Sequence, residues 1–146
     1  MAVKKQKPQP QKQGGIEVTM WFCLSMIGAL PVTPPQPAIL NAILDIPVTA
    51  NVRAQIKRLS AELRLMHEVF QETYNTVIQK HQARDDEGVL LFENEQPVMA
   101  DDAAFQAEMN AVLGEVVVLN AQPFQESDFG DKLTWRQSSA FGPLIV

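Results

Sequence analysis

The residues whose side chains could most readily bind a metal ion or take part in a reaction are two histidines on one predicted helix. His67 and Glu68 begin the pattern His-Glu-x-x-His, in which two imidazoles one helical turn apart bind zinc, but position 71 holds a glutamine. Because Gln71 cannot replace an imidazole ligand, we expect His67 to be a surface residue. His81 stands alone near the end of the same helix. We therefore predict no metal site at either histidine.

The acidic run Asp85-Asp86-Glu87-Gly88 is a second candidate site, in this case for calcium. A dedicated calcium loop spaces its oxygen ligands at alternate residues and closes with a distant bidentate glutamate, whereas these three acids are adjacent. Acids directly before a glycine are typical of a solvated turn. We predict a turn here rather than a metal site.

Cys23 is the only cysteine, so one chain can form no internal disulfide and no thiolate zinc site, and a reducing compartment is the simpler interpretation. Its neighbours Trp21, Phe22 and Leu24 are apolar. Apolar burial raises a thiol pKa, which favours a core residue over a nucleophile. The chain contains neither a Gly-x-Ser-x-Gly elbow nor a Gly-x-x-x-x-Gly-Lys phosphate loop. The sequence thus predicts a protein that is not an enzyme, with no catalytic residue and no cofactor.

Charge is distributed unevenly along the 146 residues, whose net charge is −5. Residues 1–12 hold four lysines and no acid, residues 46–84 hold six bases and three acids, and residues 85–131 hold twelve acids and no lysine or arginine. Segments of opposite sign attract within a molecule or between copies, so we expect salt-sensitive association. Nucleic acid is expected at most as a weak backbone contact through the first lysines, because no aromatic residues stand among them. These lysines are Lys4, Lys5, Lys7 and Lys12.

The elements that must position any site are dominated by one long predicted helix over 49–83, a stretch without glycine or proline. At 1.5 Å per residue it is a rod of about 50 Å. Its apolar residues alternate spacings of four and three, the pattern of a heptad seam. Since the chain offers only shorter helices, we expect the partner of this seam to come from another copy or another protein. The seam residues are Val52, Ile56, Leu59, Leu63, Met66, Phe70, Thr73 and Val77, and Leu65, Val69, Tyr74 and Ile78 widen it.

Three cations stand near the N-terminus of this helix, at Arg53, Lys57 and Arg58. Positive charge there opposes the helix dipole, at a cost of roughly a few tenths of a kcal/mol for each residue. This placement suggests an acidic partner, for instance the segment 85–131.

The first 37 residues are predicted to form an extended N-terminal arm. Residues 1–15 have too few apolar side chains to offset their ordering entropy. Residues 18–30 are apolar but shorter than the roughly 18 to 20 residues that span a membrane, so we predict no membrane span. A targeting segment is the alternative to a buried arm or short helix that packs on a partner or on the core. The prolines of 31–37 indicate a stiff spacer that holds 16–30 at a distance from the body.

Residues 38–122 are predicted to form a helical body, with a short helix over 38–46, a small hairpin from 89–93 and 97–99, and a strand over 116–119. Between the hairpin and the strand, Asp101 is expected to cap a helix that Gly114 ends. Residues 123–146 place isolated aromatics among polar turns and are predicted to form an extended C-terminal tail. The expected fold class is mainly α, with one long helix, shorter helices, a small β element and two extended arms.

Several short patterns of the body follow one another in a recognisable order. They are Leu40-Asn-Ala-Ile-Leu44, Ile56-Lys-Arg-Leu59, Met66-His-Glu-Val-Phe70, Val77-Ile-Gln-Lys-His81, Asp85-Asp-Glu-Gly88, Phe105 with Glu108, and Leu113-Gly-Glu-Val-Val117. In these patterns, residues 38–122 resemble a family of small structural or morphogenesis proteins of tailed bacteriophages that has no assigned function. The resemblance implies a virion protein made in the bacterial host cytoplasm, with no catalytic residues to carry over.

We accordingly predict a structural subunit of a phage particle, in the tail, the neck or an accessory position on the capsid, that assembles through the long helix and the arms. The alternative is a transient assembly factor or a host-directed binding module that does not remain in the virion. The expected partners are other phage structural proteins and further copies of this chain. The residues predicted to bind them are Trp21, Phe22, Leu24, Ile27, Ile56, Leu59, Leu63, Met66, Phe70, Trp135, Phe141, Leu144 and Ile145.

Overall fold

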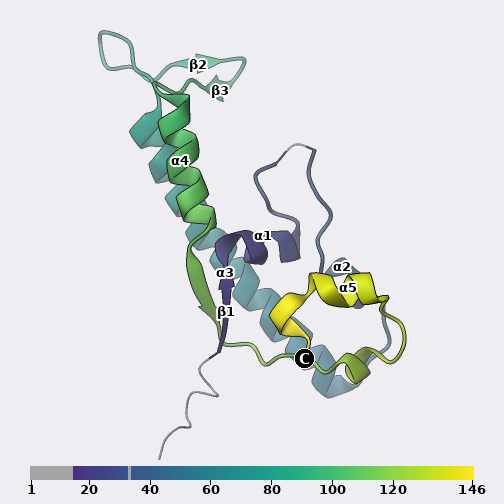
Figure 1. Cartoon of the computed structure of the whole chain (residues 1–146). Helices are drawn as coiled ribbons and strands as arrows, with labels where there is room; N and C mark the ends of the chain where they lie inside the picture. The colour runs from purple at the N-terminus through teal and green to yellow at the C-terminus, as the bar shows by residue number, and fades with distance from the viewer. Residues whose placement is uncertain (1–14, 33) are drawn as a thin grey trace, which may run out of the picture.

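A computed structural model describes residues 15–32 and 34–146 and shows a mainly α-helical fold arranged around one long helix (Figure 1). The predicted fold class is confirmed in its helical character, its single long helix and its small β elements. The elements in chain order are β1 (Ile16–Thr19), α1 (Met20–Ile27), α2 (Asn41–Leu44), α3 (Ala50–His81), β2 (Phe92–Glu93), β3 (Gln96–Pro97), α4 (Asp102–Leu113), β4 (Val116–Leu119), η3 (Glu126–Phe129), α5 (Trp135–Ala140) and η4 (Gly142–Leu144).

The long helix α3 begins and ends close to the predicted positions. Thr49 caps its N-terminus, because the hydroxyl Oγ1 accepts a hydrogen bond from the backbone N–H of Val52 at 3.3 Å. Its 32 residues correspond to a length of about 48 Å. The heptad seam is buried at six of its eight predicted positions, and Met66 and Thr73 are half-buried. The prediction of one seamed helix is confirmed.

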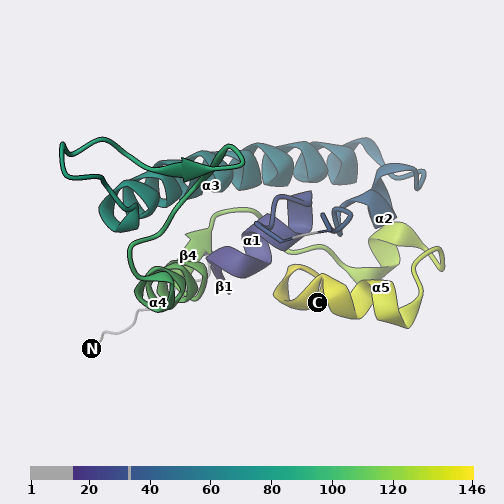
Figure 2. The same cartoon turned by 90° about the horizontal axis from the view of Figure 1, so that it is seen from above.

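The seam finds its partners within the chain, so the prediction that it needs another copy or another protein is wrong. Helix α1 packs on the middle of α3, and α4 packs on its C-terminal half (Figures 1 and 2). Sequence reasoning sought one partner helix as long as α3. Several short elements placed end to end bury the same seam.

Residues 16–30 belong to the core, so the prediction that a proline spacer holds them at a distance from the body is wrong. Of the two forms expected for this segment, the short helix packed on the core is the one observed, since α1 buries Met20, Cys23, Leu24 and Met26. The chain after the prolines returns to α1, where the backbone N–H of Leu40 donates to the carbonyl of Met26 at 3.0 Å. The prolines therefore form a returning loop instead of a rod.

Strand β1 pairs with β4 in a two-stranded antiparallel sheet that joins the start of the described chain to the segment after α4 (Figure 1). The register places Ile16 opposite Leu119 and Thr19 opposite Val116. Alternate side chains face opposite sides of a strand, so Val18 and Leu119 are buried, whereas Val116 on the other face is exposed. Strand β4 confirms the prediction over 116–119, whereas β1 was not predicted.

The C-terminal segment also packs into the core, so the prediction of an extended tail over 123–146 is wrong. Its backbone closes on itself, because the N–H of Phe124 donates to the carbonyl of Leu144 at 2.6 Å. The N–H of Val146 donates in turn to the carbonyl of Phe124 at 2.9 Å. Burying four large apolar side chains within the chain removes the need for a partner to cover them. The buried residues of this segment are Phe124, Phe129, Phe141 and Leu144.

Helix α4 lies antiparallel along α3 and has the predicted ends. The Asp101 carboxylate accepts from the backbone N–H of Ala104 at 3.1 Å, and Gly114 is the C-cap. The hairpin β2–β3 is also confirmed, although its turn contains only Asn94 and Glu95, both with positive φ. Helix α2 covers only four of the residues predicted as helix over 38–46.

Candidate interaction surfaces

The thirteen residues predicted to bind partners fall into three groups in the structure. Seven of them are buried in the core, and for these the partner-binding prediction is replaced by a role in packing, although Ile56 also lines a surface cavity. These seven are Leu24, Ile56, Leu59, Leu63, Phe70, Phe141 and Leu144. Phe22, Ile27, Met66 and Ile145 are half-buried against the same core, and only Trp21 and Trp135 are exposed. The lysines predicted to touch nucleic acid, Lys4, Lys5, Lys7 and Lys12, lie outside the described residues.

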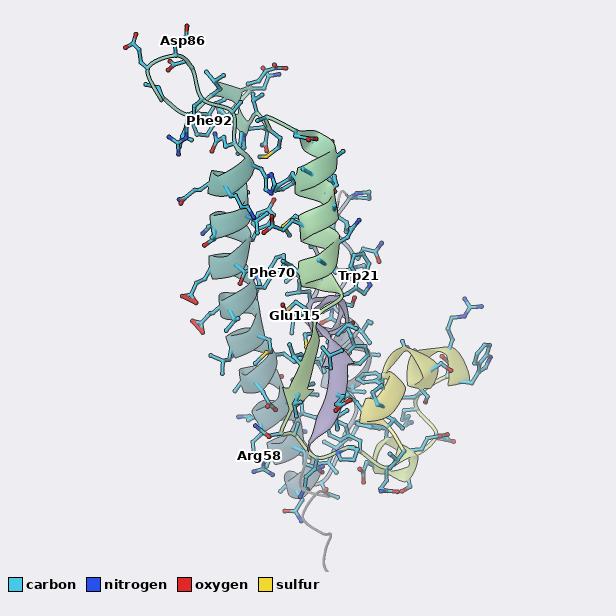
Figure 3. All side chains as sticks on the ribbon, turned by 60° about the vertical axis from the view of Figure 1, so that its left-hand side comes forward. Trp21, Arg58, Phe70, Asp86, Phe92 and Glu115 are labelled. Atoms are coloured by element: carbon cyan, nitrogen blue, oxygen red, sulfur yellow. The ribbon has the colours of Figure 1, made fainter. Side chains whose placement is uncertain are left out.

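The most prominent exposed apolar feature is the end of the rod beyond α3, which we call the tip and define as residues 85–99. Val89 is 58% and Phe92 61% exposed, and Leu91 is also exposed. Five acids and no lysine or arginine share this segment. Figure 3 shows Asp86 on the outermost loop of the tip and Phe92 just below it. Exposed apolar side chains bordered by charge are typical of a surface that binds another protein.

Hydrogen bonds hold the tip in one shape. The Asp85 carboxylate Oδ1 accepts from the backbone N–H of Glu87 at 2.8 Å and of Val89 at 3.0 Å. These bonds confirm the predicted turn over 85–88. At its base, the buried side chain of Gln82 donates from Nε2 to the carbonyl of Leu91 at 2.8 Å. The apolar side chains of the tip therefore sit on an ordered support.

Below the tip, charged side chains join α3 to α4. The Glu108 carboxylate Oε1 lies 2.8 Å from Nε2 of His81 and 3.0 Å from Nζ of Lys80. The hydrogen bond with His81, followed by that with Lys80, holds the pKa of Glu108 below its usual value. The His81 ring also meets Phe105 edge to face, with centroids 6.1 Å apart. Sequence analysis assigned His81 no partner, because residues 27 positions apart give no local signal of this contact.

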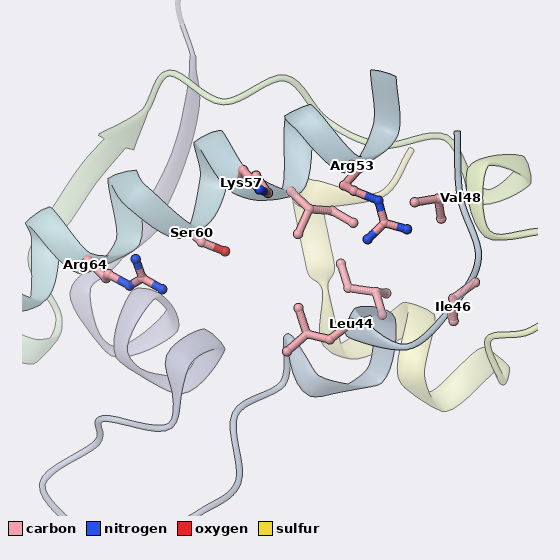
Figure 4. Close-up of a pocket in the computed structure, with 9 residues that line it drawn as sticks. Leu44, Ile46, Val48, Arg53, Lys57, Ser60 and Arg64 are labelled. Atoms are coloured by element: carbon pink, nitrogen blue, oxygen red, sulfur yellow. The ribbon is translucent and has the colours of Figure 1, made fainter. Parts of the chain in front are cut away.

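A second surface lies at the other end of α3, where it faces α2 and the segment that follows (Figure 4). A cavity of about 430 Å³ has a floor of Ile43, Leu44, Ile46, Val48 and Ile56. One face of α3 supplies its polar wall, because positions 53, 57, 60 and 64 are spaced by one or two helical turns. This wall consists of Arg53, Lys57, Ser60 and Arg64. We call this cavity, together with the neighbouring hollow lined by Ser60, Arg64 and His67, the groove.

The groove is cationic. No acidic residue lines either of its two parts. Within residues 15–32 and 34–146, the two ion pairs both involve Glu108, so Arg53, Lys57 and Arg64 are not neutralised by a neighbouring carboxylate. Figure 4 shows Arg53 extending from α3 toward Val48, and Arg64 extending from α3 further along the helix. Apolar floor and cationic wall together suit a ligand that is both apolar and acidic.

Glu62 lies on a different face of α3 and has a structural role. Its two carboxylate oxygens accept from the backbone N–H groups of Asn120 at 2.6 Å and Ala121 at 3.0 Å. The contact fixes the chain where it leaves β4. No local pattern marks it, because 58 residues separate Glu62 from Asn120 along the chain.

Cys23 is fully buried, and burial, with the nearby Glu62 carboxylate as the second cause, raises the pKa of its thiol to about 11. The thiol is therefore protonated at neutral pH, which confirms the prediction of a core cysteine. In the described part of the chain, His, Cys, Asp and Glu side chains form no group of three with the geometry of a metal site. None of the described helices is both long and apolar enough to cross a bilayer.

No protein-family model, no curated protein and no solved structure matches this chain. The assignment of a function therefore depends on the surfaces described above and on the sequence patterns of residues 38–122. Of these surfaces, sequence analysis named neither the tip nor the groove as a site. A signal was present for each, in the apolar residues beside the acidic turn at 85–88 and in the cations near the start of α3.

Proposed function

We propose that the protein is a non-enzymatic structural subunit of a tailed-bacteriophage particle, in the tail, the neck or an accessory position on the capsid. The proposal takes its phage origin from the resemblance of residues 38–122 to small tailed-phage proteins. It takes its mode of action from the tip, where apolar side chains are held in water at the end of a rod.

The tip is the observation that carries the proposal. Leaving Val89 and Phe92 exposed forgoes about 25 cal/mol for each Å² of apolar surface that burial would remove from water. The tip stands away from the core, supported by the antiparallel pair α3 and α4 (Figure 3). Such a support brings a small apolar surface to a partner without requiring the rest of the molecule to rearrange.

The side chains that could take part in a reaction, Cys23, His67 and His81, each have a packing or binding role in the structure. The Cys23 thiol packs in the core, and His81 is bound to Glu108 across the α3–α4 contact. His67 lines the outer part of the groove. These placements favour packing and binding over covalent chemistry.

Mass spectrometry of purified particles tests the proposal. The particles should come from the phage, or the induced prophage, whose genome encodes the chain. We expect the protein to be present, and we expect Phe92→Ser to reduce its incorporation while leaving its fold intact. Val116→Ser, at an apolar residue of similar exposure on β4 and away from the tip, is the matched control.

Detection in lysates of infected cells but never in mature particles would contradict the proposal. It would favour the alternative, a transient assembly factor or a host-directed binding module.

A further inference from the structure

The tip and the groove have complementary properties but cannot meet within one molecule. The tip combines exposed apolar residues with five acids, and the groove combines an apolar floor with three cations. Arg64 lies 17 residues before His81, where α3 ends just before the tip, so α3 separates the two surfaces by at least about 26 Å. Arg53 and Lys57 lie still further from the tip.

We propose that the tip of one copy docks in the groove of a second copy. Phe92 and its apolar neighbours cover the floor around Leu44, while Glu93 and the acids of the 85–88 turn face Arg53, Lys57 and Arg64. This contact deepens the proposed function, on which it rests, by naming the partner as the chain itself and the surfaces as these two.

Charge complementarity selects this occupant. Arg53, at the end of the first turn, opposes the dipole of α3, and Arg53, Lys57 and Arg64 repel one another along one face, so the groove is favourable to approaching anionic groups. The tip is the one part of residues 85–131 that joins several acids to exposed phenylalanine. Opposite charges at the rim mainly accelerate association and fix its orientation, whereas the apolar anchor supplies affinity.

The contact is heterologous, because two different surfaces of each copy take part. Each molecule has one tip and one groove, so the contact repeats from copy to copy. Such a series closes into a ring if its rotation allows and otherwise extends as a filament.

Two variants of the full chain test the proposal. The groove variant carries Arg53→Glu, Lys57→Glu and Arg64→Glu, and the tip variant carries the neutral changes Asp86→Asn, Phe92→Ser and Glu93→Gln, which provide no positive charge for the reversed groove to attract. All six positions are exposed, and acids near the start of α3 agree with its dipole, so both variants should fold. Circular dichroism checks that they do.

Analytical ultracentrifugation in low salt then gives the molecular mass of wild type, of each variant and of their mixture. We expect wild type to self-associate, each variant alone to remain a monomer, and their equimolar mixture to form a 1:1 dimer and nothing larger. The groove variant still has a tip and the tip variant still has a groove, so the mixture retains one functional contact. Phe92→Ser alone should weaken wild-type association about 30-fold or more, as expected for an anchor residue.

The matched control reverses three other exposed cations, with Arg58→Glu, Lys132→Glu and Arg136→Glu, and should associate like wild type. A wild type that stays monomeric at high micromolar concentration would overturn the proposal and leave the groove to a different protein. A mixture that contains no 1:1 dimer would overturn it too. Neither result would remove the protein from purified particles, so the proposed function would survive this failure and is tested separately.

Discussion

The two halves of α3 are buried in different ways. Its C-terminal half packs on α4, which follows it along the chain, in a cluster that includes Phe70, Val77, Met109 and Leu113. Its N-terminal half lies in a larger cluster that collects residues from both ends of the chain, from Val18 to Leu144. Burial of the C-terminal half therefore depends mainly on α4, together with Met20 and Leu24 of α1, whereas burial of the N-terminal half draws on more segments of the chain.

The same division separates the two charged surfaces. The C-terminal half of α3 ends in the acidic tip, and the N-terminal half forms the cationic groove with α2 and the segment that follows it. A helical hairpin is suited to presenting a small protruding surface. A core made of many short segments leaves a concave surface where they meet. In the proposed docking, each half of the rod supplies one side of the contact.

Truncation at the N-terminus should have the largest effect on stability, because it removes part of the core that covers α3. Removal of residues 1–37 deletes β1 and α1, and with them Val18, Met20, Leu24 and Met26 from the core. We expect the truncated chain to lose cooperative thermal unfolding, measured by circular dichroism. A body that remained folded would instead support the idea of a detachable arm.

A single substitution in the C-terminal segment comes next in size. Phe141 is fully buried, so Phe141→Ala should lower the free energy of unfolding by about 3–5 kcal/mol. Trp135, only six residues earlier, is 77% exposed. The substitution Trp135→Ala should change the free energy of unfolding by no more than about 0.5 kcal/mol. Urea unfolding of both variants measures the difference. Equal, small effects would show that this segment is not part of the core.

The link between α3 and the end of β4 should contribute less. Glu62→Ala leaves the N–H groups of Asn120 and Ala121 without their acceptor, at a cost of about 1–3 kcal/mol. Glu68, exposed on the same helix, has no such bond among the described residues, and Glu68→Ala is the control. Urea unfolding would contradict the assignment if the two variants were equally stable.

The smallest effect is expected from Glu108 and depends on pH. Its folded-state pKa lies below the unfolded value near 4.5, so its contribution is present above that pH and is lost as pH falls through the lower, folded pKa. Glu108→Gln should therefore melt below wild type at neutral pH, and the gap should close in acid. A gap that stayed constant with pH would exclude the ion pair as its cause.

Periodicity predicted the regular elements well, and it did so for a physical reason. The seam of α3, the Asp101 cap, the Gly114 stop and the turn at 85–88 all depend on residues within one or two helical turns of each other. The burial of Phe124 and Phe141 depends on which distant segments meet, and composition alone does not carry that information. The prolines of 31–37 predict a stiff spacer although they form a returning loop, because the two have similar local sequences.

The candidate surfaces also have some features that local sequence predicts and others that depend on the fold. The cations at the start of α3 were recognised as needing an acidic partner, since the dipole argument is local. The apolar floor that Ile46 and Val48 supply could not be foreseen, because it forms only when the segment after α2 folds back on α3. Nor does the sequence predict that the tip is exposed, because this depends on α4 beginning below it.

Hydrogen exchange of the isolated full-length protein tests most directly whether residues 16–30 and 123–146 belong to the body. We predict slow exchange in α1 and at the N–H groups of Phe124 and Val146, comparable with the middle of α3. Exchange at the rate of an unfolded chain throughout residues 123–146 would contradict this account.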